Sequence, residues 1–245
     1  MFVKTNRYVE ESMLVIIQND PEVPAGNFDD TITELGVPSR TIHSYAGDAV
    51  PFGGDISAAI VLGGSMGVHD TERHSFLVGV KGFIRSCLRD NTPLLGVCLG
   101  GQLLADVLGG VVIAASPYGE KGTIPVILNR AGGKDPLFAD IPREFITFQW
   151  HNDSFDVPIG GVHLASSIAC PVQAFRFGAC AWGTQFHPEV NRSIVECWAR
   201  WTDETESTAE KYVADFVHSE RSYQEVSRKL LVNFLRIAGL LDENA

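Results

Sequence analysis

The chain has 245 residues, enough to bury a hydrophobic core without disulfide or metal staples. Hydrophobic residues make up 45% of it and charged residues 20%, which excludes wholesale disorder and a fibrous repeat. The 19 Lys and Arg against 30 Asp and Glu give a net charge of −11. Because this charge repels phosphate backbones and anionic lipid headgroups, we expect no nucleic-acid partner and no membrane partner.

The five cysteines are widely spread and form no Cys-x-x-Cys pair, so neither a disulfide framework nor a metal site is expected. This usage favours a reducing, cytoplasmic compartment. Residues 1–20 mix charges around an apolar run that is too short for a signal peptide. The apolar stretch at 94–116 contains Asp106, which at mid-bilayer would cost roughly 3 kcal/mol, so we expect strand, turn and helix there instead of a membrane span.

Continuous apolar runs of strand length alternate with helical patterns in the first half of the chain. The runs lie at residues 13–17, 58–62 and 93–97 and are typical of strands covered on both faces. Residues 29–35 and 75–88 repeat apolar side chains at helical spacing. This alternation predicts an α/β fold around a parallel sheet with right-handed crossovers.

After Gly110 the chain changes to short β-like runs separated by turn residues. We expect them to add partly antiparallel strands to the same sheet, at residues 111–115, 123–128, 145–150, 162–166 and 172–177. From Glu189 onward the pattern is helical again. Since no repeat, low-complexity tract or Pro-rich linker marks a boundary, residues 1–245 are expected to form a single domain.

Cys98 lies in the sequence Gly96-Val-Cys-Leu-Gly100, between an apolar strand and a helical pattern. Glycines in this arrangement permit a strained strand-to-helix turn that exposes the central side chain at the carboxyl end of the strand. At a helix N-terminus, the helix dipole and free N–H groups favour a thiolate. The sequence therefore predicts a nucleophile at Cys98; the alternative is a small buried cysteine among glycines needed for packing.

A nucleophilic cysteine requires a base, and His187 is the best placed of the seven histidines. It ends an alternating apolar-polar run, where side chains at i and i+2 share a face, so Glu189 is expected beside the imidazole. A carboxylate there fixes the tautomer and leaves the other ring nitrogen to take the thiol proton. The alternative is a surface histidine beside a helix that starts at Pro188 and Glu189.

A glycine-rich turn, Gly63-Gly64-Ser65-Met-Gly67, follows the strand at 58–62. We expect the backbone N–H groups of Gly64 and Leu99 to form an oxyanion hole. Phosphate binding is the alternative function for such a turn. However, the turn lacks the Lys and the Ser or Thr of a P-loop, and no G-x-G-x-x-G opens a helix elsewhere, so no cofactor is expected.

Taken in order, four segments resemble the class I (triad-type) glutamine amidotransferases, especially free-standing members similar to the glutaminase part of GMP synthase. The segments are Gly63-Gly64, residues 96–102, Trp150-His-Asn-Asp153 and Gln185-Phe-His-Pro-Glu189. The resemblance covers about residues 13–190 and the closing helix near 229–237. It implies a three-layer, flavodoxin-like sandwich around a mostly parallel sheet, with short antiparallel strands and a C-terminal helical tail.

The same resemblance implies a Cys98-His187-Glu189 triad that removes the side-chain amide of L-glutamine through a γ-glutamyl thioester and releases ammonia. The glutamine's amino-acid end would be held by Gln102, His151, Asp153 and Ser154. The chain has no Ser-Gly-Gly-x-Asp-Ser pyrophosphatase loop and no length for a synthetase domain, so the ammonia would pass to a separate synthase partner. Two alternatives stay open: a stand-alone γ-glutamyl amide or peptide hydrolase with the same triad, and a non-enzymatic relative with a regulatory cysteine.

Three positions depart from the family pattern. Ser65, Gly101 and Asn152 stand where the family often has proline, histidine and glycine. Ser65 is expected to loosen the oxyanion loop, and Asn152 to alter which γ-substituent fits. None of the three removes a triad group.

Residues 192–227 form a helical extension longer than the catalytic domain requires. Its charged residues alternate with an apolar stripe of Tyr212, Val213 and Phe216, a pattern that suits packing on the domain or on a partner. We favour the first, in which the extension covers the sheet. Deleting it is then expected to destabilise the fold more than it changes specificity.

Overall fold

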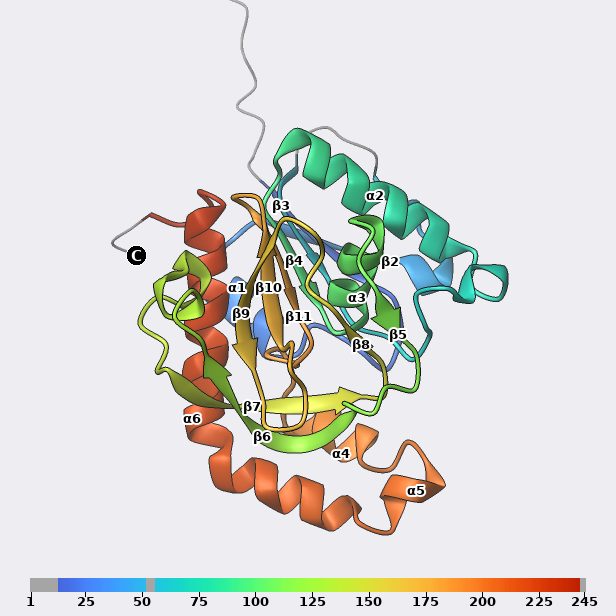
Figure 1. The fold of residues 1–245 in the computed structure, drawn as a ribbon, viewed down its shortest axis with the longest axis vertical. Coiled ribbons are helices and arrows are strands. Elements are labelled where there is room, and N and C mark those ends of the chain that lie inside the picture. Colours follow the sequence, from blue (N-terminus) through green and yellow to red (C-terminus); the bar gives the residue numbers. More distant parts are fainter. Residues whose placement is uncertain (1–12, 52–55, 243–245) are drawn as a thin grey trace, which may run out of the picture.

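The computed structural model describes residues 13–51 and 56–242 (Figure 1). The sequence predicts no signal peptide in residues 1–20. Residues 1–12 of that segment lie outside the described residues. Among the described residues, no helix is both long enough and apolar enough to cross a membrane.

A mixed sheet runs through the described chain in the order β2-β1-β3-β4-β11-β10-β9-β6-β7. The strands from β2 to β11 in this order are parallel, and the strands from β10 to β7 are antiparallel to their neighbours. Their bounds are β1 Met13–Gln18, β2 Ser39–His43, β3 Ile56–Val61, β4 Leu94–Val97, β6 Glu120–Leu128, β7 Glu144–His151, β9 Gly161–Ser166, β10 Ala174–Phe177 and β11 Ala181–Thr184.

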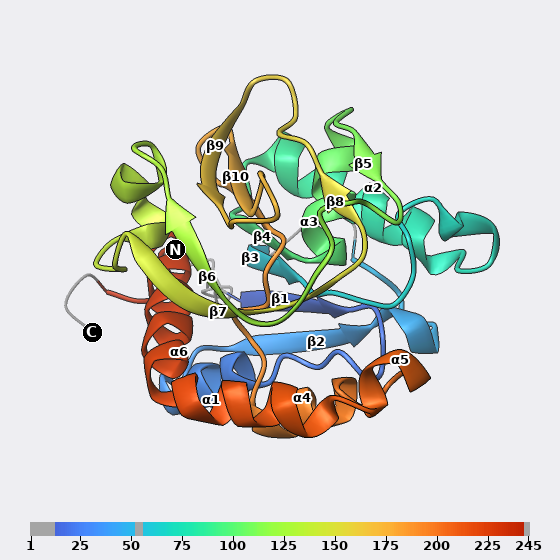
Figure 2. The ribbon, with the colours of Figure 1, turned by 60° about the horizontal axis from the view of Figure 1, so that its bottom comes forward.

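Helices cover both faces of this sheet, which gives three layers (Figures 1 and 2). Helices α2 and α3 share one hydrophobic cluster with the sheet, and α1 and the C-terminal half of α6 share another on the opposite face. The bounds are α1 Asn27–Glu34, α2 Phe76–Asp90, α3 Leu99–Val107, α4 Arg192–Trp198, α5 Asp203–Glu206 and α6 Ala209–Ile237, with 3₁₀ turns at Ser44–Ala46, Asp70–Glu72, Gly132–Lys134 and Pro136–Phe138. The expected α/β fold with added antiparallel strands is confirmed.

One strand was not predicted, and one strand prediction is wrong. The sequence gives no sign of β2, because this edge strand is mostly exposed and its residues Ser39, Arg40 and Thr41 form no apolar run. The prediction that residues 111–115 join the main sheet is wrong. Only Val112–Ile113 is extended there, as β5, and it pairs with β8 (Ser154–Phe155) in a separate two-stranded sheet beside α3.

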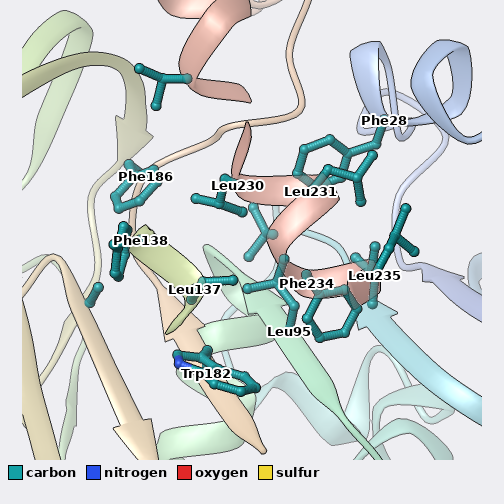
Figure 3. Packing of buried hydrophobic residues seen from close by; sticks show 14 of the residues in the cluster. Phe28, Leu95, Leu137, Phe138, Trp182, Phe186, Leu230, Leu231, Phe234 and Leu235 are labelled. Atoms are coloured by element: carbon teal, nitrogen blue, oxygen red, sulfur yellow. The ribbon is translucent and has the colours of Figure 1, made fainter. Parts of the chain in front are cut away.

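The long helix α6 closes the fold. Figure 3 shows Leu230, Leu231, Phe234 and Leu235 of α6 pointing into the core that Trp182 of β11 also lines. The ring of Phe234 meets that of Trp182 edge to face, with centroids 6.5 Å apart. Each such buried side chain stabilises the fold by roughly 1.5–3 kcal/mol relative to exposure. One continuous helix therefore contains both the end of the expected extension and the closing helix.

Helix α3 lies unusually close to the strands beside it, because its first turn carries glycine. A Cβ atom added at Gly100 would lie 1.9 Å from the carbonyl oxygen of Val61 in β3. One added at Gly101 would lie 2.7 Å from the carbonyl oxygen of Thr184 in β11. Backbone, rather than a movable side chain, blocks both positions, so these glycines set how α3 packs on the sheet.

We expect Gly100→Ala to destabilise the protein by at least about 2 kcal/mol, because α3 must move away from β3 to make room for the methyl group. Urea unfolding measures the loss. The matched control is Gly133→Ala, where an added Cβ meets nothing within 4 Å; it should stay within about 0.5 kcal/mol of the parent. Equal stability of the two variants would contradict the packing argument.

Candidate active site

Cys98 lies between β4 and α3 in a strained backbone conformation, with φ +49° and ψ −109°. Residues other than glycine rarely adopt a positive φ angle, and such backbone strain persists only where the surrounding structure imposes it. Here the N–H of Cys98 donates to the carbonyl of Thr184 at 2.8 Å, and its own carbonyl accepts from the N–H of Gln102 at 2.9 Å. The strained turn expected from the sequence is therefore present, but the expected exposure is not, because the side chain of Cys98 is only 6% exposed.

The imidazole of His187 is hydrogen-bonded to Glu189 and lies beside Cys98. Its Nδ1 donates to the Glu189 carboxylate at 2.7 Å, and Cys98 is close enough to act on its charge state. Burial favours the neutral ring and lowers the pKa of His187, but the charges of Glu189 and Cys98 outweigh burial and raise the pKa to about 10. The raised pKa favours the protonated ring, because the nearby Glu189 carboxylate stabilises its positive charge.

The segment that carries His187 and Glu189 is held by three other parts of the chain. The N–H of His187 donates to the carbonyl of Phe148 in β7 at 2.8 Å, and the hydroxyl of Tyr223 in α6 donates to the carbonyl of His187 at 2.9 Å. The N–H of Asn27 at the start of α1 donates to the carbonyl of Glu189 at 2.7 Å. His187 lies beyond the end of β11, in a single bridge with β7, and the helical chain resumes only at α4.

The glycine-rich turn after β3 lies against the same residues. A Cβ added at Gly63 would lie 3.0 Å from Cε1 of His187 and 3.6 Å from Cβ of Cys98. One added at Gly64 would lie 3.0 Å from Cδ2 of Leu99, so the two residues expected to form the oxyanion hole pack against each other. A side chain at Gly63 would press on the imidazole, which explains why the turn is glycine there.

Ser65 does not loosen this turn, contrary to expectation. Its N–H and its hydroxyl both donate to the Oδ2 atom of Asp20, at 3.0 and 2.6 Å. Asp20 is buried and lies two residues after the end of β1. Charge-assisted hydrogen bonds of this kind are stronger than neutral ones. Asp20 therefore fixes the turn through Ser65, the residue that stands where the family often has proline.

A cavity of about 340 Å³ opens over Cys98. Most of the residues expected to bind substrate line it, and it is formed by Gly64, Ser65, Met66, Cys98, Gln102, Trp150, His151, Asn152, Asp153, Trp201 and Thr202. Ser154 is not among them, since it is buried and its hydroxyl donates to that of Ser116 at 2.7 Å. Asp153 is oriented by the N–H of Ala115, which donates to its Oδ1 atom at 2.9 Å.

Sequence reasoning did not single out Gln185. Its Nε2 atom donates to the sulfur of Cys98 at 3.6 Å, and its Oε1 atom accepts from Nε2 of Gln102 at 3.3 Å. The same Nε2 of Gln102 reaches the carbonyl of Asp153 at 3.4 Å. Gln185 thus joins Cys98 to the cavity wall, and its place two residues before His187 is the signal that could have identified it.

The helical extension also contributes to the site. Trp201 and Thr202, between α4 and α5, line the cavity. The ring of Trp198 at the end of α4 packs edge-on against His187, with centroids 4.7 Å apart, and stacks on Trp201 at 6.1 Å. Figure 2 shows α4 and α5 running alongside α6 below the sheet. An apolar stripe alone does not reveal which surface it will cover, so this contribution was not predicted.

A family model described as "Glutamine amidotransferase class-I" matches residues 27–194. The chain belongs to the class I glutamine amidotransferase family. The matched segment contains the Cys98 elbow, the glycine-rich turn, the His187 and Glu189 pair, and α4 up to Ile194. Trp198, Trp201 and α6 follow it in the sequence.

The chain covers very different shares of its curated relatives. The glutamine amidotransferase-like protein YfeJ of Salmonella typhimurium is 27% identical over 193 residues, which are 76% of this chain and 80% of that protein. The GMP synthase (glutamine-hydrolyzing) of Bacillus subtilis is 34% identical over 162 residues, which are 59% of this chain and 29% of that enzyme. The chain therefore spans less than a third of the length of this GMP synthase.

Solved structures agree over nearly the whole chain. A glutamine amidotransferase from Thermotoga maritima superposes with a TM-score of 0.83 at 27% identity, covering 93% of this chain and 98% of that one. A glutamine amidotransferase from Methylobacillus flagellatus gives a TM-score of 0.82 at 22% identity, covering 93% and 95%. The second likeness shows the fold alone. Together they cover more of the chain than the family model does.

Glu189→Gln tests the origin of the His187 pKa. We expect that pKa to fall from about 10 by about 1–3 pH units, because the amide keeps a hydrogen-bonding oxygen but lacks the charge. Titration of the ring by NMR measures it, and Glu196→Gln, which removes an exposed carboxylate of α4, is the control. An unchanged midpoint in Glu189→Gln would contradict the assignment.

The raised pKa also has a consequence for stability. The folded state binds the His187 proton more tightly than the unfolded state does, so protonation of His187 increases the free energy of unfolding. This increase is complete below pH 6.5, the ordinary pKa of histidine, and is lost as the pH rises through about 10. The difference in unfolding free energy between the parent and Glu189→Gln should therefore shrink across this range.

Proposed function

We propose that this protein hydrolyses the side-chain amide of L-glutamine with Cys98 as nucleophile, His187 as acid and base, and Glu189 as the carboxylate that orients and charges the imidazole. The observation that carries the proposal is the buried His187–Glu189 contact at 2.7 Å, with the same imidazole beside Cys98 at a strained elbow. Family membership supports the same chemistry.

The first half-reaction forms a thioester. The Cys98 thiolate attacks the γ-carbonyl carbon, and the new C–S bond forms as the carbonyl electron pair moves onto oxygen. The N–H groups of Gly64 and Leu99 are proposed to donate hydrogen bonds to the resulting oxyanion. When this intermediate collapses, the C–N bond breaks. As it breaks, the His187 imidazolium gives its proton to the leaving nitrogen, which departs as ammonia.

The second half-reaction returns the enzyme to its starting state. Neutral His187 takes a proton from water as the oxygen attacks the thioester carbon. The C–S bond then breaks, glutamate leaves, and the thiolate and imidazolium are restored. Glu189 stabilises the imidazolium in both halves without itself taking the proton.

Gln102 and Asp153 are proposed to hold the amino-acid end of glutamine, because they line the cavity beside Cys98. His151 lines the same cavity and is proposed to contribute by fixing the Asp153 backbone, because its Nδ1 donates to the carbonyl of Asp153. The Asp153 carboxylate can accept from the α-ammonium group, and the Gln102 amide can donate to the α-carboxylate. Ser154 belongs to this group only through the fixed position of its neighbour Asp153, because its hydroxyl is directed to Ser116. Ammonia released here would pass to a separate synthase partner, as the relationship to GMP synthases suggests.

A second candidate function is hydrolysis of γ-glutamyl amides that carry a larger amine. The observation that favours it is the apolar part of the cavity wall, which is formed by Met66, Trp150 and Trp201. Glutamine has only an NH₂ group at the γ-position and would leave these surfaces uncovered. An aliphatic or aromatic amine substituent would bury them.

A glutamine-like chloroketone or diazo-ketone tests the nucleophile. We expect mass spectrometry to find one adduct, on Cys98, with glutamine protecting against it, because the inhibitor needs both the thiolate and the amino-acid site. Cys98→Ser should give no adduct and lose at least about 10³-fold in glutaminase activity. Cys197→Ser, which removes the exposed free cysteine, should retain both. An adduct elsewhere, or unchanged amide hydrolysis in Cys98→Ser, would favour a non-enzymatic relative with a regulatory cysteine.

Trp201→Ala distinguishes the two candidate substrates. If the aromatic wall binds a γ-substituent, kcat/KM for a γ-glutamyl anilide should fall by about 10–30-fold, the effect of truncating one aromatic anchor, while glutamine turnover changes little. Tyr118→Ala, which removes an exposed aromatic ring outside this cavity, is the control. Robust turnover of the anilide by the isolated parent protein, above that of glutamine, would contradict the amidotransferase proposal.

A further inference from the structure

A second group of chemistry-bearing side chains lies next to the cavity over Cys98. Glu120, His151 and Cys170 are 7%, 5% and 1% exposed and come from β6, β7 and the turn between β9 and β10. A carboxylate oxygen, a ring nitrogen and the sulfur of these residues all lie within 4.8 Å of one another. None of them belongs to the proposed triad.

The register of the sheet brings the first two together. Glu120 begins β6 and His151 ends β7, and the two residues are direct partners in the antiparallel pairing. Directly opposed residues place their side chains on the same face of the sheet, about 4.5–5.5 Å apart at Cβ. Their proximity therefore follows from the fold itself.

The turn that carries Cys170 is tied to the same carboxylate. The hydroxyl of Ser167 and the amide of Gln173 donate to Oε2 of Glu120 at 2.7 and 2.6 Å. Across the turn, the N–H of Ser167 donates to the carbonyl of Cys170 at 2.9 Å. Glu120 thus fixes the turn that presents the sulfur.

The ring of His151 shows that this cluster is electrostatically incomplete. Its Nδ1 must donate to the carbonyl of Asp153, at 2.8 Å, because a carbonyl only accepts. Its buried Nε2 has no hydrogen-bond partner and lies 3.8 Å from Oε2 of Glu120. In a neutral ring this nitrogen points a lone pair toward a carboxylate, an arrangement that a cation between the two would stabilise. The buried Oε1 of Gln173 also has no partner.

We propose that Glu120, His151 and Cys170 bind a divalent transition-metal ion, with zinc as the best match to the donor set. Imidazole nitrogen, thiolate sulfur and carboxylate oxygen are all zinc ligands, and their bonds of about 2.0–2.3 Å put neighbouring donors of a tetrahedron about 3.3–3.8 Å apart. The distance of 3.8 Å between Nε2 of His151 and Oε2 of Glu120 already meets this spacing. The sulfur needs an approach of about 1 Å, within reach of a small side-chain rotation.

The ion would also have an entry path and an open coordination position. Glu120 and His151 line a second cavity, of about 560 Å³, which shares His151 and Asn152 with the cavity over Cys98. Three protein ligands with a fourth position open to water is a common zinc arrangement. The proton of the Cys170 thiol leaves to the solvent on coordination. A bound ion would hold His151 in the wall that the two cavities share.

Cobalt titration of the full chain carrying Cys98→Ser tests the proposal, because the active-site sulfur is then absent. We expect one equivalent of Co²⁺ to bind with a thiolate-to-cobalt charge-transfer band and the intense visible bands of tetrahedral cobalt. Adding Cys170→Ser should abolish the charge-transfer band, whereas adding Cys197→Ser should leave it intact. A band that survives Cys170→Ser, or no band at all, overturns the proposal.

A second measurement avoids changing the cluster, in case Cys170→Ser fails to fold. X-ray absorption of the Cys98→Ser protein loaded with one equivalent of Zn²⁺ should show one sulfur and the remaining ligands nitrogen or oxygen. A spectrum with nitrogen and oxygen alone would mean a surface site and would overturn the proposal; so would failure to retain zinc on dialysis. Both experiments use a protein without the catalytic sulfur, so their outcome is independent of the proposed hydrolysis.

Discussion

The position of one strained residue organises this molecule. Cys98 holds a left-handed backbone conformation of a kind that costs of order 1–3 kcal/mol, and the packing of α3 on the sheet imposes it. Gly100 and Gly101 let α3 approach the carbonyls of β3 and β11 more closely than any side chain allows. The hydrogen bond from Cys98 to Thr184 then ties Cys98 to β11, the strand that leads to His187.

The buried pair of His187 and Glu189 is the second constraint, and segments far apart in the sequence maintain it. Asn27 at the start of α1, Phe148 in β7 and Tyr223 in α6 each hydrogen-bond to the backbone of the segment that carries the pair. A buried carboxylate and imidazole stabilise each other only while both are held in contact. The C-terminal helices therefore belong to the site, both as supports and through Trp201 in the cavity wall.

Two cavities share the residues at the end of β7. His151 and Asn152 line both, so the two cavities share part of their wall. On one side lie Cys98 and the amides of Gln102 and Gln185; on the other lie Glu120 and, behind it, Cys170. This arrangement gives the protein a physical route by which a bound ion could alter substrate binding.

The sequence by itself determined the parallel core and the candidate nucleophile, base and carboxylate. Local patterns were sufficient there, because apolar runs, flanking glycines and i, i+2 spacing act over a few residues. It missed β2, which is held by pairing with β1 rather than by its own apolar side chains, and it misplaced residues 111–115. Only the tertiary structure decided that Asp20 holds Ser65, that Ser154 turns to Ser116, that Trp201 lines the cavity, and that Glu120, His151 and Cys170 meet. These contacts join residues distant in the chain, and strand register and helix packing set them, neither of which any single segment encodes.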